Sequence, residues 1–107
     1  MVAPFGWHVV THSKVEEIRT RLGNFESMTW NQILVEGKKQ HHSVEVWKLC
    51  KAAQARLEAI GLGDSAQLVS LSLSGKERIW GLRQGIALLV LWWDPEHEVC
   101  PSLLKHT

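Results

Sequence analysis

The sequence contains no tyrosine, only two cysteines and no long apolar run. Its longest strongly apolar stretch, residues 86–93, has eight residues, whereas a helix that spans a membrane needs about 20. Cys50 and Cys100 form no CxxC pair, so we expect two thiols in a reducing compartment rather than a zinc knuckle or a thioredoxin-type site. The amino terminus lacks a basic leader and a small-residue cleavage signature, so no secretory signal is expected. Together these absences predict a cytoplasmic protein that does not bind membranes.

An excess of charge of one sign is also missing. Twelve basic and eleven acidic residues give a formal charge of +1, so nucleic-acid binding would require a local cluster of Lys and Arg. Apolar residues make up 45% of the chain and charged residues 21%, as in ordinary globular proteins. With 107 residues, the chain is expected to form a single domain over residues 1–107.

Three segments in the first 60 residues carry helical signals. Residues 13–22 and 30–35 are each introduced by a capping box, a hydroxyl residue followed three positions later by Glu or Gln. Gly23 and Asn24 are expected to end the first of these helices. Residues 43–60 form the longest amphipathic stretch, and Cys50 lies in its apolar stripe. Cys50 is therefore expected to be a small buried apolar residue rather than a nucleophile.

The pattern changes to strands from residue 67 onward. Alternating apolar and serine residues, a tight turn, a strand over residues 77–83 and an apolar strand over 86–93 predict antiparallel hairpins, with residues 98–100 as a short fourth strand. The expected fold class is α+β: two or three N-terminal helices packed on one face of a small antiparallel sheet of three to four strands. Adjacent strand residues point to opposite faces, so Trp92 or Trp93 should meet a second surface: a helix, a partner protein or a nucleobase, of which a partner protein is favoured.

The segment "SGKERIWGLRQG", followed by "IALLVLWWDPEHEV", resembles the basic and hydrophobic strands of RelE-type toxins. The likeness covers about the last 40 residues, and the helical part resembles the family by the order of its elements. The resemblance implies a toxin of a toxin–antitoxin-like system, an endoribonuclease that cleaves messenger RNA, usually on the ribosome. It further implies a cognate antitoxin as partner and neither a metal nor a cofactor.

Such cleavage needs a base for the ribose 2′-hydroxyl, cations for the charge on phosphorus and an acid for the leaving oxygen. The resemblance implies catalytic roles for Arg83, His97 and His106, and phosphate contacts for Lys76, Arg78 and Lys105. Arg78 and Arg83 point to opposite faces of their strand, so they are not expected to contact the same phosphate. Arg83 together with Lys76 is favoured, and if the hairpin folds as expected, His97 converges with them. The family frequently uses a tyrosine, which is absent, and histidine is the expected chemical replacement.

Other interpretations of the same residues stay open. The chain could be a noncatalytic member of the same fold that binds a protein through an exposed tryptophan. A metal site could form from His41, His42, His97 and His106, although no carboxylate or thiol stands at a familiar ligand spacing from the adjacent pair, so none is expected. The two arginines could pair with glutamates on a solvated face, and Asp94 before a proline is typical of a turn.

Overall fold

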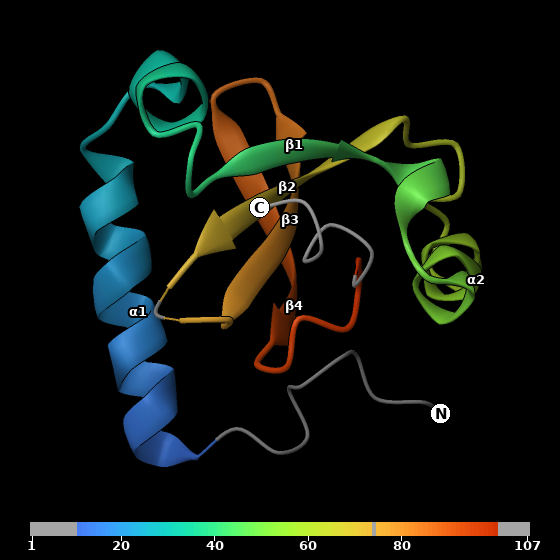
Figure 1. The fold of residues 1–107 in the computed structure, drawn as a ribbon, viewed down its shortest axis with the longest axis horizontal. Helices are drawn as coiled ribbons and strands as arrows, with labels where there is room; N and C mark the ends of the chain where they lie inside the picture. Colours follow the sequence, from blue (N-terminus) through green and yellow to red (C-terminus); the bar gives the residue numbers. More distant parts are fainter. Residues whose placement is uncertain (1–10, 74, 101–107) are drawn as a thin grey trace.

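The fold was determined from a computed structural model that describes residues 11–73 and 75–100. Its elements, in chain order, are α1 (His12–Glu26), the π-helical turn η2 (Gln32–Glu36), β1 (His42–Glu45), the 3₁₀ turn η3 (Val46–Lys48), α2 (Lys51–Ala59), β2 (Gln67–Ser72), β3 (Arg78–Gln84) and β4 (Ala87–Asp94). Figure 1 shows the sheet between α1 on one side and α2 on the other. The predicted α+β class is confirmed. No helix in the described ranges is long and apolar enough to cross a membrane.

The first helix begins one residue earlier and ends later than its sequence pattern predicts. Thr11, not Ser13, is the N-cap: its Oγ1 accepts a hydrogen bond from the Lys14 amide at 3.1 Å. Gly23 does not stop the helix, which continues to Glu26. The continuation brings Phe25 against the core, so tertiary packing outweighs the helix-breaking tendency of glycine.

The capping box at the second helical segment is confirmed. The Thr29 amide donates to Gln32 Oε1 at 2.8 Å, and the Gln32 amide donates to Thr29 Oγ1 at 3.1 Å. The segment η2 then ends at Gly37. A Cβ atom on Gly37 would lie 2.7 Å from the Ile33 carbonyl oxygen, so the chain can turn this closely only with glycine.

The prediction of one long helix over residues 43–60 is wrong in its first half. Residues 42–45 form β1, an edge strand in which Val44 is buried while Ser43 and Glu45 are exposed. Only the second half of the predicted helix is helical, as α2. The reason is that β1 pairs its backbone with β2 from His42↔Ser70 to Glu45↔Gln67, which a helix-spaced apolar pattern does not reveal.

The four strands form one antiparallel sheet in the order β1-β2-β3-β4. The predicted fourth strand over residues 98–100 is therefore replaced by β1, at the opposite edge of the sheet. The β3–β4 ladder is shifted at Trp80/Gly81 by a bulge. Gly81 is required there, because a Cβ atom would lie 2.8 Å from the Leu89 carbonyl oxygen and 2.9 Å from the Leu88 side chain.

The two faces of the sheet carry separate cores, so the helices do not gather on one face as the sequence suggested. Trp92 packs with Trp80 and Leu57 in the cluster that α2 covers, which we call the α2 core. Trp93 packs with Ile18 in the cluster that α1 and η2 cover, the α1 core. One of the paired tryptophans does meet a second surface, as expected, but that surface is helical: Trp93 packs in the α1 core. The favoured partner protein is not needed to cover it, because both tryptophans are buried inside the chain.

Candidate functional site

Asp94 holds the turn that follows β4. Its carboxylate is 1% exposed and accepts three hydrogen bonds: from the Glu98 amide at 2.8 Å, from the Val99 amide at 2.9 Å and from Trp80 Nε1 at 3.2 Å. Two of these donors lie within five residues of Asp94, so the carboxylate folds the "DPEHEV" segment around itself. The turn role expected for Asp94 agrees with this geometry.

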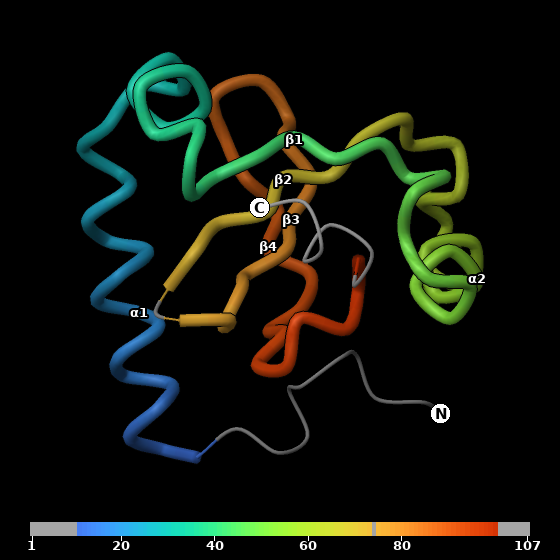
Figure 2. The backbone as a smooth tube through the Cα atoms, in the orientation of Figure 1, coloured from blue at the N-terminus to red at the C-terminus, as the bar shows by residue number. Residues whose placement is uncertain are grey.

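The segment after Asp94 returns across the face that α2 covers. The Cys50 amide, at the start of α2, donates to the Val99 carbonyl at 2.8 Å. Cys100 Sγ lies 3.4 Å from the Lys48 carbonyl, and Val99 and Cys100 are both fully buried in the α2 core. Figure 2 shows the chain turning back from β4 toward α2. Residues 95–100 thus form a loop held at both ends, which we call the 95–100 loop.

His97 lies in this loop in a strained and enclosed position. Its φ is 59°, the only positive φ of a non-glycine residue in the described ranges. The side chain is 7% exposed, and its Nδ1 is buried without a hydrogen-bond partner. A left-handed non-glycine residue and an unsatisfied buried polar atom each cost free energy, and both concentrate at functional sites.

His42 and Arg78 lie on the same face of the sheet as this loop. His42 pairs with Ser70 and Arg78 pairs with Ser72, and residues two apart on a strand share a face. Arg78 also pairs with Asp94 across β3 and β4. We call the three side chains the His42–Arg78–His97 cluster.

The electrostatics of the cluster favour a neutral imidazole at His42. Burial lowers the pKa of His42, and the nearby charges of Arg78 and His97 lower it further. Burial also lowers the pKa of Arg78, while the Asp94 carboxylate opposes that effect. Arg78 Nη1 donates to the Gly75 carbonyl at 2.7 Å and to the Glu77 carbonyl at 2.9 Å, which fixes the guanidinium beside the cluster.

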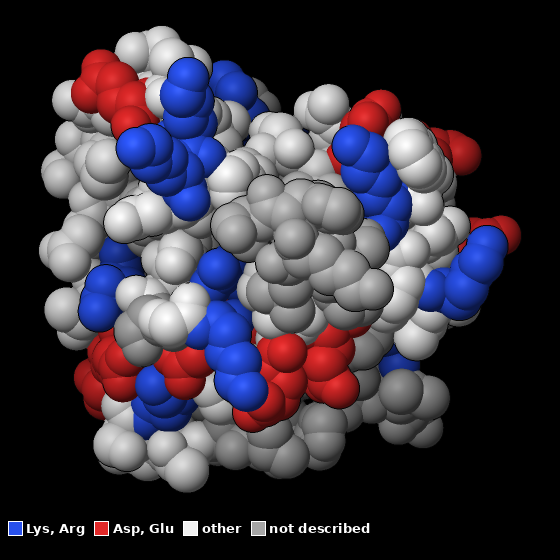
Figure 3. Space-filling model, viewed as in Figure 1, with Lys and Arg blue, Asp and Glu red and all other residues white. Residues whose placement is uncertain are grey.

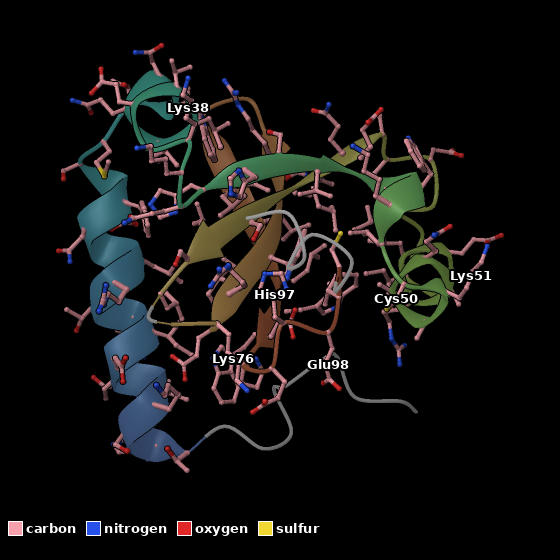
Figure 4. All side chains as sticks on the ribbon, viewed as in Figure 1. Lys38, Cys50, Lys51, Lys76, His97 and Glu98 are labelled. Atoms are coloured by element: carbon pink, nitrogen blue, oxygen red, sulfur yellow. The ribbon has the colours of Figure 1, made fainter. Side chains whose placement is uncertain are left out.

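The residues predicted from sequence divide between two ends of β3. In Figure 4, Lys76, in the turn before β3, lies near His97 and far from Lys38. Lys76 Nζ lies 2.6 Å from Glu96 Oε1, next to His97 in sequence. Arg83 pairs with Leu88 at the other end of β3, about 17 Å along the strand from Arg78 at about 3.3 Å per residue. The expected convergence of Lys76, Arg83 and His97 therefore does not occur.

Arg83 has a different environment from the cluster. Its guanidinium carbon lies 4.7 Å from the centre of the Trp30 ring, and its Nε donates to the Gly85 carbonyl at 3.3 Å. Lys105 and His106, the remaining predicted site residues, lie outside the described residues. Sequence reasoning considered His42 only as a possible metal ligand in a polar segment, whereas the structure places it at the start of the edge strand β1.

The Lys76–Glu96 ion pair is expected to contribute little to folding. Both side chains are about three-fifths exposed, at 60% and 59%, so solvent and salt screen their attraction. We expect Lys76→Ala to leave the urea midpoint of unfolding unchanged, in low salt and in high salt. A clear drop of the midpoint in low salt would contradict this. Lys76 would then be a structural residue rather than a cation available to a ligand.

Charges of both signs lie near the cluster, including the Lys76–Glu96 ion pair and Asp94. In Figure 3, lysines and arginines on the visible face are interspersed with acidic residues and form no continuous basic surface. Within residues 11–73 and 75–100, no group of three or more His, Cys, Asp or Glu side chains is placed to hold a metal ion. The arrangement offers proton transfer by imidazoles and anion binding by a guanidinium.

Comparisons with protein-family models, with curated proteins and with solved structures find no match to this chain. The site is therefore interpreted from its own residues.

Acid is expected to destabilise the fold through two histidines. Burial is the largest cause of the lowered pKa of both His41 and His42, so the folded state favours their neutral forms. Below the usual histidine pKa of about 6.5, the unfolded chain binds more protons than the folded chain. The free energy of unfolding should fall as the pH drops below this value and level off below the folded pKa values.

Urea unfolding between neutral and mildly acidic pH measures this effect. Carboxylates also titrate at the acid end, so the pH dependence of the free energy of unfolding of the wild type is compared with that of His41→Asn and His42→Asn. Each substitution should flatten this dependence between pH 7 and 5, roughly the range in which histidine titrates. An unchanged slope in both variants would show that neither histidine contributes.

Proposed function

We propose that this protein is a RelE-type toxin that cleaves messenger RNA, without a metal or cofactor, at the His42–Arg78–His97 cluster. The observation that carries the proposal is that the imidazoles of His42 and His97 and the guanidinium of Arg78 lie on the same face of the sheet. His97 is buried and has a strained, left-handed backbone. Imidazoles suit proton transfer near neutral pH, and a guanidinium suits a phosphate. The absence of tyrosine is compatible with this set, because histidines supply both proton-transfer groups.

The roles follow from the charges. His42, held neutral by burial and by its positive neighbours, accepts the proton of the ribose 2′-hydroxyl. The 2′-oxygen attacks the adjacent phosphorus while Arg78 stabilises the added negative charge. The bond from phosphorus to the 5′-oxygen then breaks, and the imidazolium of His97 gives its proton to that oxygen. The products are a 2′,3′-cyclic phosphate and a 5′-hydroxyl end.

The test uses purified protein and ribosomes that carry a defined messenger RNA. We expect the messenger to be cut in the presence of a metal chelator, leaving cyclic-phosphate ends. A messenger with 2′-deoxyribose at the cut positions should stay intact, because it lacks the attacking hydroxyl. Intact messenger under all conditions, on ribosomes and free, would overturn the proposal.

A second candidate function, noncatalytic binding of the cognate antitoxin, is favoured by an apolar groove on the opposite face. The groove has a volume of about 820 Å³ and runs between the end of α1, the 28–33 segment and the β3–β4 hairpin. Ile86 lies at the tip of the β3–β4 hairpin, at the edge of the groove, and is 97% exposed. Arg83 lies over Trp30 of the groove wall and makes no ion pair within the described ranges. We propose that an antitoxin segment with apolar side chains and an acidic residue opposite Arg83 fills it.

Co-expression with a candidate antitoxin separates the two functions. If the groove is the binding surface, Ile86→Asp should release a copurifying antitoxin while His97→Asn should not. Capture of the partner together with uncut RNA would select the noncatalytic function. Equal capture by wild type and Ile86→Asp would remove the groove as the binding surface.

A further inference from the structure

His41 makes an unusual bond at the start of the edge strand. Its imidazole is buried, at 8% exposed, and Nδ1 accepts a hydrogen bond from the Ser72 amide at 3.0 Å. The β1–β2 ladder ends at His42↔Ser70, so Ser72 has no β1 backbone carbonyl opposite it. The His41 side chain supplies the acceptor that the missing part of the strand would provide.

The ring is closely seated by two other elements. The Phe25 ring of α1 meets it edge to face, with centres 4.9 Å apart and planes at 88°. A Cβ atom on Gly37 would lie 3.0 Å from His41 Cδ2, so the preceding turn also fits against the ring. The His41 amide donates to the Gly37 carbonyl at 3.0 Å. His41 is therefore fixed by its backbone, its ring face and its Nδ1 atom.

We call the hydrogen bond from the Ser72 amide to His41 Nδ1 the clamp. It lies directly beside His42 and Arg78, two members of the cluster. His42 is the next residue, and Ser72 pairs with Arg78 across β2 and β3. The Nδ1 bond thus ties His41, the residue before β1, to Ser72, which pairs with the strand position that carries the Arg78 guanidinium. If the bond is broken, the end of an edge strand of four residues is released together with His42.

We propose that His41 is a positioning residue: it does not touch substrate but holds His42 at a fixed place relative to Arg78, and it does so only while Nδ1 is unprotonated. The inference rests on the proposed function for its consequence in catalysis. The bond itself is independent of that function.

Protonation of His41 turns Nδ1 from an acceptor into a donor that faces another donor, the Ser72 amide. Among the described residues, the charged or titratable groups that act on His41 are His42 on β1 and Arg78 on β3. The contacts from α1 and β2 come from Phe25 and Ser72, which carry no charge. Burial, and then these two neighbouring groups, lower the pKa of His41, so the clamp opens only in acid.

Two substitutions distinguish the role of Nδ1 as a hydrogen-bond acceptor from the role of the rest of the His41 side chain. His41→Asn keeps an acceptor, Oδ1, at the same branch position but cannot titrate, whereas His41→Ala removes the acceptor. In hydrogen exchange at neutral pH, the Ser72 amide should lose at least about tenfold protection in His41→Ala and keep it in His41→Asn. In mild acid, the wild type should lose protection at Ser72 and His41→Asn should not. NMR titration of the His42 ring gives a second readout, which should shift in His41→Ala alone.

Cleavage assays on ribosomes complete the test. His41→Ala should lower kcat by about tenfold with little change in KM, and His41→Asn should restore kcat at neutral pH. In acid, His41→Asn should keep only the loss of rate that protonation of the base His42 causes, so its rate should fall less steeply than that of the wild type. If the wild type does not cleave RNA, the proposed function fails while the exchange and NMR results still decide the clamp. Unchanged Ser72 protection and an unchanged His42 titration in His41→Ala would overturn the inference, as would failure of His41→Asn to retain them.

Discussion

Asp94→Ala is expected to lower the free energy of unfolding by about 3 to 5 kcal/mol, close to the whole stability of many small domains. The substitution leaves three donors without their acceptor, two of them buried, on Trp80 and Val99. It also releases the 95–100 loop, whose end fills the α2 core. Urea unfolding followed by tryptophan fluorescence measures the loss.

Asp94→Asn and Glu96→Ala are the matched controls. The asparagine has the same shape but turns one acceptor into a donor facing a backbone amide, so its loss should fall between alanine and wild type. Glu96 is exposed in the same turn, and its replacement should leave the midpoint unchanged. If Asp94→Ala unfolds no more easily than Glu96→Ala, the three hydrogen bonds do not hold the loop.

His97→Gly is expected to lower the rate of RNA cleavage by about 10² to 10⁴ fold, the usual contribution of a general acid. The fold should survive, because glycine adopts a φ of 59° without strain and the unpartnered Nδ1 atom disappears. We expect the free energy of unfolding to stay within about 1 kcal/mol of the wild type. Single-turnover cleavage and urea unfolding of the same preparation provide both numbers.

His97→Asn serves as the second variant, because asparagine tolerates the left-handed region but transfers no proton. Both variants should be inactive and folded. Full activity in either would remove His97 from the mechanism, and unfolding of both would show that the imidazole is held there for structural reasons.

The sequence was informative where local chemistry decides structure. The capping box at Thr29 and the alternation along β2 involve only residues close in the chain, and both were predicted. The edge strand β1 was not, because its four residues form a strand only through pairing with β2, more than 20 residues later. Apolar residues on either side of β1 have helical spacing, and tertiary pairing overrides that local preference.

The candidate site was predicted in part for the same reason. His97 and Lys76 were chosen from a local segment and do lie at one end of the sheet. Arg83 was expected beside them, but the length of β3 separates it from Arg78. His42 comes from a distant segment, and its approach to Arg78 depends on strand order, which the sequence pattern does not specify.

The hydrogen bond from the Cys50 amide to the Val99 carbonyl has a consequence for binding. With Asp94 at one end and this bond at the other, the chain around His97 resembles a closed ring whose conformational entropy is already lost in the folded protein. Under the proposed function, RNA would not have to order this segment on binding, so that part of the conformational entropy cost of binding is already met when the protein folds. The affinity for RNA would then depend partly on Cys50, the N-cap of α2, which carries none of the cluster's side chains.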